Sequence, residues 1–145
     1  MYFVDREKIE ATLIFMEKQI NLIKSNKNWE SAIEKAALER TLHTIIEAVL
    51  DTGNAMIDGF IMRDPGSYED IVDILTDEKV VDEGLSIVLK RFISFRKMLV
   101  QQYIEVDHKA LINETSASIT KLQLFPDCVR SYLTDELGPV SAFRN

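Results

Sequence analysis

The stretch Ser31–Phe60, SAIEKAALERTLHTIIEAVLDTGNAMIDGF, decides the fold of this 145-residue chain. Ser31 is followed three residues later by Glu34, the spacing of a capping box that marks the start of a helix. Apolar residues then recur at the spacing of one helical face: Leu38, Leu42, Ile45, Val49, Met56 and Phe60. The pattern predicts a long amphipathic helix that runs to about Gly59.

Helices are also predicted on both sides of this stretch. Upstream, residues 4–24 carry apolar residues at three-and-four spacing: Ile9, Leu13, Met16, Ile20 and Ile23. Downstream, Asp64-Pro65-Gly66 predicts a turn. Ser67 and Asp70 are then placed to cap a short helix.

Two further long helices complete the prediction. One covers residues 83–103 and is capped by Asp82. The other covers residues 107–137 and is expected to break near Pro126, because proline lacks an N–H donor and clashes with the preceding turn. The sequence contains no repeat and no alternating run typical of a strand. The predicted fold is therefore all-α, an up-down bundle of four long helices plus one short helix, in a single domain spanning residues 1–145.

Composition limits the function classes. The net charge of −7, from 17 basic and 24 acidic residues, disfavours nonspecific binding to DNA or anionic lipid. The single cysteine, Cys128, cannot form an internal disulfide, which suits a reducing compartment. The N-terminal segment reaches a charged residue already at Asp5, which is not typical of a signal peptide. No apolar run approaches the ~20 residues of a membrane span. We therefore expect a cytoplasmic protein without a membrane partner.

Polar residues share one face of the second helix at steps of three or four: His43, Glu47, Asp51, Asn54 and Asp58. Such a face could hold a metal or could simply face solvent. Di-metal carboxylate bundles draw Glu-x-x-His from two helices, and that motif is absent here, so we expect neither a metal nor another cofactor. Glu47 and Asp51 remain candidates to pair with a cation from a neighbouring helix.

The fourth helix is the basic exception in an acidic chain. Residues 84–104 include no acidic residue but four cations: Lys90, Arg91, Arg96 and Lys97. Cations near a helix C-terminus complement its dipole, which accounts for Lys97. Arg96 instead lies within roughly 40° of the predicted core stripe, at about 100° per residue: Leu85, Val88, Leu89, Phe92, Phe95, Leu99 and Tyr103. It must pair with Glu47 or Asp51, or else face a cleft as a phosphate ligand, and spacing alone does not decide between the two.

The run Arg96-Lys97-Met98-Leu99-Val100-Gln101-Gln102-Tyr103, followed by Val106-Asp107, resembles the signature of the HepT toxins. These are members of the HEPN superfamily of small helical ribonucleases. The upstream Pro65-x-Ser67-Tyr68 and the short acidic helix after it are also similar to this family. The resemblance extends in helix order over nearly the whole chain.

This resemblance implies a homodimer whose paired motifs line a cleft and cleave RNA without a metal. It also implies neutralisation by a MntA-type nucleotidyltransferase antitoxin, which can modify the motif tyrosine, here Tyr103, with AMP. Arg96 would hold the scissile phosphate.

The chain departs from the family pattern at two positions. Gln101 occupies the position of the family histidine, and Lys97 that of a common asparagine. A glutamine amide does not titrate, so the general acid–base contribution of about 10²–10⁴-fold would be lost. His108 could replace the histidine only if the chain folded back. In an uninterrupted helix Gln101 also lies about 140° from Arg96, so the two would meet only across a dimer or where the helix ends.

Three functional predictions follow. The first is a HepT-like protein that binds RNA or nucleotide through Arg96, Lys97 and Gln101 but cleaves weakly or not at all. The second is an active ribonuclease toxin that depends on Arg96, Lys97 and Tyr103. The third is an inert dimeric interaction module that binds a nucleotidyltransferase or another protein.

Overall fold

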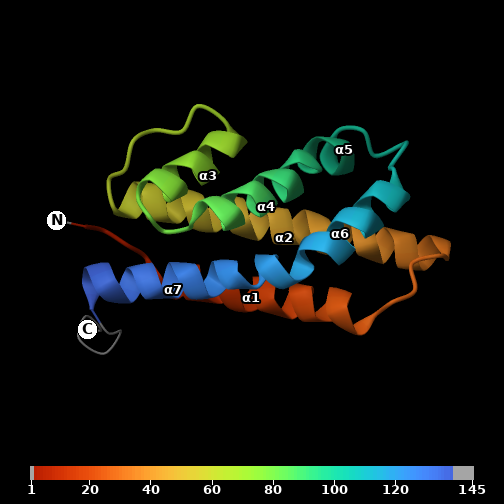
Figure 1. Ribbon diagram of the computed structural model, residues 1–145, viewed down its shortest axis with the longest axis horizontal. Helices are drawn as coiled ribbons and strands as arrows, with labels where there is room; N and C mark the ends of the chain where they lie inside the picture. The colour runs from red at the N-terminus through yellow and green to blue at the C-terminus, as the bar shows by residue number, and fades with distance from the viewer. Residues whose placement is uncertain (1, 139–145) are drawn as a thin grey trace.

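The computed structural model describes residues 2–138, which form seven helical segments joined by short connections (Figure 1). They are α1 (Arg6–Ser25), α2 (Ala32–Gly59), α3 (Tyr68–Asp77), α4 (Glu83–Ser94), α5 (Arg96–Val100), α6 (His108–Leu122) and α7 (Leu124–Leu137). Single-residue joints separate α4 from α5 and α6 from α7. If α4 with α5, and α6 with α7, are each counted as one interrupted helix, the structure confirms the predicted all-α bundle of four long helices and one short one.

Helix α2 lies at the centre of the bundle. It packs along α1 on one side and against α3, α4 and α5 on the other, while α7 runs beside α1 (Figure 1). The predicted stripe of α2 is buried throughout, and its residues belong to one apolar core shared by all the long helices. Among residues 2–138, no helix has both the length and the apolar content needed to cross a membrane.

The start of α2 confirms the capping box. The Ser31 side chain accepts a hydrogen bond from the Glu34 N–H at 3.1 Å, and the Glu34 carboxylate accepts one from the Ser31 N–H at 3.0 Å. These bonds satisfy N–H groups that have no partner within the helix. Asp82 caps α4 and Asp107 caps α6 in the same way, as acceptors of backbone N–H groups.

The predicted fourth helix, residues 83–103, is wrong in two respects. It breaks at Phe95, whose N–H donates to the Phe92 carbonyl three residues back, and the Ser94 hydroxyl donates to the Arg91 carbonyl. Tightened turns and serine back-bonding are common causes of helix bends. The second part then ends at Val100. Tyr103 was predicted to lie in the core stripe but is 66% exposed, because the helix ends before reaching it.

The predicted break in the last helix is also displaced. The joint is at Gln123, and Pro126 lies inside the first turn of α7. Proline is tolerated there because the first N–H groups of a helix need no intrahelical acceptor. The proline thus marks the start of α7, and the break precedes it.

Gly53 allows α3 to pack closely on α2. A Cβ atom at this position would lie 2.4 Å from the Ile71 Cγ2 atom of α3, and Ile71 is buried. Only a residue without a side chain fits this approach. The contact fixes the N-terminal end of α3, where Tyr68 begins the helix.

Arg130 of α7 ties that helix to α1 through a network of ion pairs. Its Nε donates to Glu10 at 2.7 Å, and its Nη1 and Nη2 donate to the two oxygens of Glu17 at 2.9 and 2.8 Å. These hydrogen bonds from Arg130 lower the pKa of Glu17. The network crosses the seam between the first and last helices.

This network predicts acid-sensitive stability. Because the pKa of Glu17 is lowered on folding from 4.5, its contribution is complete above pH 4.5 and is lost as pH falls through the folded value. In the Arg130→Met variant, we expect unfolding free energy to fall less steeply between about pH 5 and 3 than in wild type. The difference should be about 1 kcal/mol or less, because solvent screens these partly exposed groups.

Urea denaturation at several pH values measures this slope. Glu34, whose pKa is lowered chiefly by the Ser31 backbone N–H, is unchanged in both proteins and keeps its own acid sensitivity in each. Parallel pH profiles for the two proteins would contradict the assignment.

Candidate functional site

Arg96 is the first residue of α5 and lies directly after the helix break. Its Nε donates to Glu47 Oε1 of α2 at 2.6 Å, and its guanidinium carbon lies 4.5 Å from the centre of the Tyr68 ring. The side chain is 22% exposed. The hydrogen bond to Glu47 raises the pKa of Arg96, so the guanidinium is charged. Of the two predicted partners, Glu47 makes the direct contact, whereas the exposed Asp51 adds only longer-range attraction.

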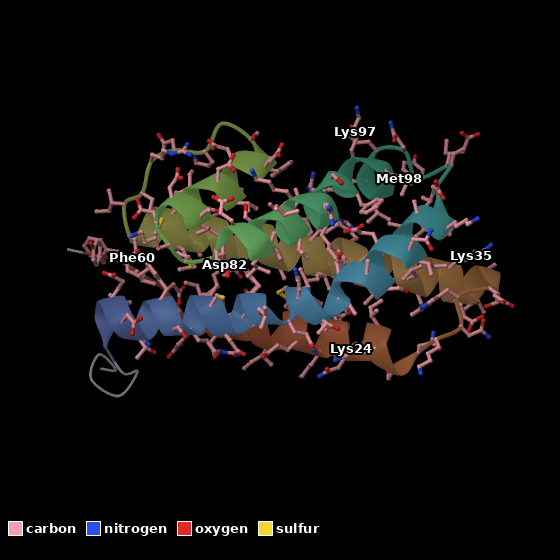
Figure 2. All side chains as sticks on the ribbon, viewed as in Figure 1. Lys24, Lys35, Phe60, Asp82, Lys97 and Met98 are labelled. Atoms are coloured by element: carbon pink, nitrogen blue, oxygen red, sulfur yellow. The ribbon has the colours of Figure 1, made fainter. Side chains whose placement is uncertain are left out.

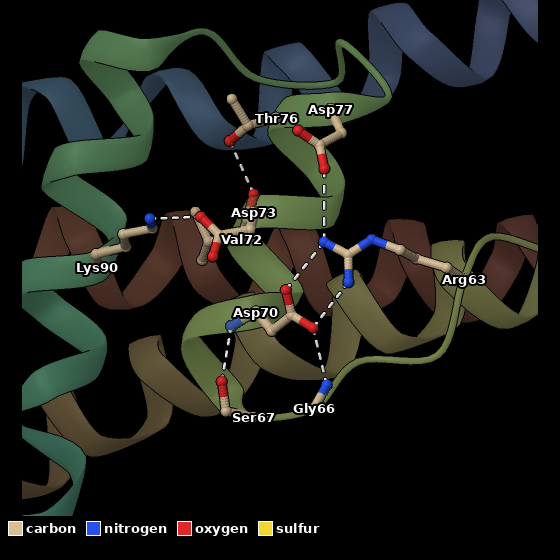
Figure 3. A network of polar contacts seen from close by, with 9 residues as sticks. All are labelled: Arg63, Gly66, Ser67, Asp70, Val72, Asp73, Thr76, Asp77 and Lys90. Carbon is tan, nitrogen blue, oxygen red and sulfur yellow. Dashed lines mark hydrogen bonds and ion pairs between the residues drawn. The ribbon is translucent and has the colours of Figure 1, made fainter.

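The terminal nitrogens of Arg96 set it apart from two other paired arginines. In Arg63, Nη1 and Nη2 both donate to Asp70 at 2.9 Å, and Nη2 also approaches Asp77 (Figure 3). In Arg130 both terminal nitrogens contact Glu17. Within residues 2–138, the hydrogen bond of the Arg96 side chain is made by Nε, and none is found from Nη1 or Nη2. Arg96 is therefore held to Glu47 by a hydrogen bond at Nε alone, unlike Arg63 and Arg130, whose terminal nitrogens are hydrogen-bonded.

The polar face of α2 has two distinct parts. Asp51, Asn54 and Asp58 are exposed, as expected of a solvated face. His43 and Glu47 are half-buried, with His43 Nε2 lying 3.6 Å from Glu47 Oε1. In the described part of the chain, no group of three or more His, Cys, Asp or Glu residues is arranged to hold a metal ion.

The other predicted site residues lie at the exposed end of α5. Lys97 extends into solvent from this helix (Figure 2). Gln101 is the exposed C-terminal cap, and its N–H donates to the Lys97 carbonyl at 2.8 Å. Tyr103 follows in the loop, next to Ile104, which is 87% exposed. Because α5 ends at Val100 and Gln101 is its C-cap, the 140° separation expected from a continuous helix does not fix where the Gln101 side chain points.

Sequence reasoning missed two contacts of the site. The stacking of Arg96 on Tyr68 was not predicted, although Tyr68 was noted as part of the upstream motif. His108 Nε2 lies 2.8 Å from Glu39 Oε2, so this histidine is engaged with α2. Glu39 lies four residues before His43, so spacing places it on the same face of α2, but spacing within one helix does not predict its contact with His108 of α6.

Comparison with known proteins supports the resemblance of the motif. A family model described as "Ribonuclease HepT-like" matches residues 15–129, which is most of the chain. The chain belongs to the HepT-like ribonuclease family. A Bacillus subtilis (strain 168) member named "Putative RNase YutE" is 58% identical over 144 residues, covering 99% of this chain and 100% of that protein.

Solved structures agree with this HepT-like assignment. The structure of B. subtilis YutE, described as a cytosolic protein of unknown function, superposes with a TM-score of 0.95 at 59% identity, covering 99% of this chain and 100% of that one. A complex of MntA with a toxin carrying a tyrosine-to-alanine substitution gives 0.75 at 16% identity, with coverage of 85% and 98%. The tri-AMPylated Shewanella oneidensis HEPN toxin, bound to its MNT antitoxin, gives 0.72 at 18%, with coverage of 86% and 95%. The last two share the fold.

Proposed function

We propose that this HepT-like protein binds RNA by its phosphates and cleaves it slowly. The observation that carries the proposal is the guanidinium of Arg96, which contacts Glu47 and Tyr68 but makes no hydrogen bond from its terminal nitrogens to the described residues. Two parallel N–H donors match two oxygens of one phosphate. Lys97 adds an exposed positive charge beside it.

The slow rate that we propose follows from the chemistry of RNA cleavage. A base removes the proton of the ribose 2′-hydroxyl, whose oxygen attacks phosphorus. The bond to the 5′-oxygen then breaks and that oxygen takes up a proton, leaving a 2′,3′-cyclic phosphate and a 5′-hydroxyl. Arg96 stabilises the charge that develops on the phosphate oxygens. Gln101 contributes hydrogen bonds but transfers no proton, so cleavage lacks the acid–base group that other HepT-like members place there.

Assembly and regulation are part of the same proposal. We place the protein in the cytoplasm as a single-domain homodimer, with a MntA-type nucleotidyltransferase as its antitoxin. The solved complexes of HEPN toxins with such antitoxins support this partner. Tyr103 would be the residue that accepts AMP, and its 66% exposure makes its hydroxyl accessible to a modifying enzyme.

A second candidate function is an interaction module without catalysis. The exposed pair Tyr103 and Ile104 favours it, because adjacent exposed aromatic and aliphatic side chains suit a protein partner. In this alternative the Arg96–Glu47 pair would serve the fold alone, and RNA would bind no better to wild type than to a variant without Arg96.

Binding of labelled single-stranded RNA to wild type and Arg96→Ala separates these functions. We expect Arg96→Ala to weaken binding by about 10–100-fold, since a charged hydrogen-bonded contact contributes about 1.5–3 kcal/mol. The salt dependence of binding should also become shallower, because one phosphate contact is lost.

Arg63→Ala is the matched control. It removes the same charge from an arginine whose fork already donates to Asp70, so its RNA affinity should stay close to wild type. Equal affinity of wild type and Arg96→Ala, with both folded, would support the interaction module. An equal loss in both variants would indicate a nonspecific charge effect.

A further inference from the structure

A polar row along α2 contacts both α5 and α6. Glu39, His43 and Glu47 follow one another at intervals of four residues, so they lie on one face of the helix. Glu39 pairs with His108 of α6 at 2.8 Å, and Glu47 pairs with Arg96 of α5 at 2.6 Å. His43 lies between Glu39 and Glu47 in this row, and His108, the chain's other histidine, contacts the row from α6.

The two histidines differ in how they are engaged. His108 Nε2 lies within hydrogen-bond distance of Glu39. His43 Nε2 is 3.6 Å from Glu47 Oε1, beyond a hydrogen bond, and its side chain is 28% exposed. No other polar partner of the His43 ring is found within residues 2–138. His43 therefore has a ring nitrogen that is accessible and not committed.

His43 is also close to the proposed phosphate site. Its Nε2 and the Nε of Arg96 approach the same oxygen of Glu47, at 3.6 and 2.6 Å. The distance between these two nitrogens therefore cannot exceed the sum of their distances to that shared oxygen. His43 and Arg96 therefore flank the same carboxylate oxygen, which brings the imidazole next to the arginine of the proposed phosphate site.

We infer that His43 is the acid–base group of the residual RNA cleavage, in place of the imidazole missing at position 101. This inference rests on the proposed function. The imidazole takes the 2′-hydroxyl proton as the 2′-oxygen attacks phosphorus, and the resulting imidazolium or a water molecule protonates the departing 5′-oxygen. No oxidant, metal or other co-reactant is needed for this balance. Imidazole suits the role because it exchanges a proton near neutral pH.

The surrounding charges are consistent with this role. Glu47 on the same helix faces both His43 and Arg96, with its Oε1 lying 3.6 Å from His43 Nε2 and 2.6 Å from Arg96 Nε. Arg96 from α5 pairs with this Glu47, whereas Glu39 on α2 is paired with His108 from α6. His108 is the matched comparison residue, because it contacts the same row from α6 through Glu39 and not through Glu47.

The test measures cleavage and binding of labelled single-stranded RNA in EDTA, across about pH 5–8, where imidazole changes its charge. The proteins are full-length wild type, His43→Ala, His108→Ala, Gln101→His and the double variant His43→Ala with Gln101→His. We expect His43→Ala to cleave about 10²-fold more slowly, to lose the titration seen in the wild-type pH profile and to bind RNA as wild type does. His108→Ala should keep both rate and profile. The double variant should regain cleavage from its new imidazole.

Two outcomes would overturn the inference. One is a His43→Ala variant that cleaves at the wild-type rate with the wild-type pH profile. The other is a wild type that binds RNA through Arg96 but yields no product, which rejects a catalytic His43 while the proposed RNA binding stands. A wild-type protein that does not bind RNA would instead reject the proposed function itself. Because Gln101→His is measured in both backgrounds, a His43→Ala protein that merely fails to fold is recognised by its failure to be rescued.

Discussion

Replacing Gln101 with histidine is expected to raise the rate of RNA cleavage by about 10²-fold, at the lower end of what general acid–base catalysis contributes. The new imidazole would stand at the position that supplies the proton-transferring group in the family resembled by this motif. Gln101 is exposed and caps the end of α5, so the larger side chain meets no buried neighbour. We expect a rate increase at the lower end of this range because His43 is inferred to supply part of the acid–base catalysis already.

Gln102→His is the matched control for this result. Gln102 is the adjacent exposed residue in the same turn, and its substitution adds an imidazole of identical chemistry one position away. Cleavage of labelled tRNA and single-stranded RNA in EDTA should therefore rise with Gln101→His and stay near wild type with Gln102→His. Equal rates for the two variants would show that position 101 has no special relation to the phosphate that Arg96 is proposed to bind.

Phe125→Ala is expected to cost about 3–5 kcal/mol of unfolding free energy. Phe125 is fully buried and lies in the first turn of α7, immediately after the joint with α6. Removing its ring leaves a cavity where the two helices meet, and this neighbourhood cannot collapse freely because Pro126 restricts the backbone. A loss of this size is a large fraction of the roughly 5–15 kcal/mol that stabilises a typical domain.

Urea denaturation of Phe125→Ala and Leu124→Ala measures this effect with an internal reference. Leu124 is the preceding residue and is 52% exposed, so its truncation should change stability by no more than about 0.5 kcal/mol. The two transitions should share a slope and differ in midpoint. Similar midpoints for the two variants would contradict the packing described for α7.

The fold could be predicted from sequence largely because its signals are local. Capping residues such as Ser31 and Asp82 and the apolar stripe of α2 predict helix starts and faces without knowledge of the partners. The joints at Phe95 and Gln123 could not be predicted in this way, because neither residue is a glycine or a proline that would mark a helix break in the sequence. Pro126 correctly indicated an interruption of the last helix, but the interruption lies three residues earlier, at Gln123. A proline in the first turn of a helix does not break it.

The candidate site was predicted less completely. Spacing identified Arg96 as an arginine that needs a partner and named Glu47 as one of two candidates, and Glu47 makes the contact. It could not indicate that Tyr68 stacks on the guanidinium, because that contact joins α3 to α5 through tertiary packing alone. The catalytic and binding roles of Arg96, Lys97, Gln101 and Tyr103 remain predictions for the experiments above.

The anchoring of Arg96 also has a thermodynamic consequence for any anion that it binds. A free arginine must give up side-chain rotamers when it grips a ligand, a cost of about 0.5–1.5 kcal/mol per immobilised side chain. Here the Glu47 bond and the Tyr68 ring already restrict those rotamers when the chain folds. The side chain of Arg96 therefore loses its conformational entropy when the chain folds, and little further entropy is lost when an anion binds. Lys97, which extends freely from α5, gains no such advantage, and its contribution to affinity should be correspondingly more sensitive to salt and temperature.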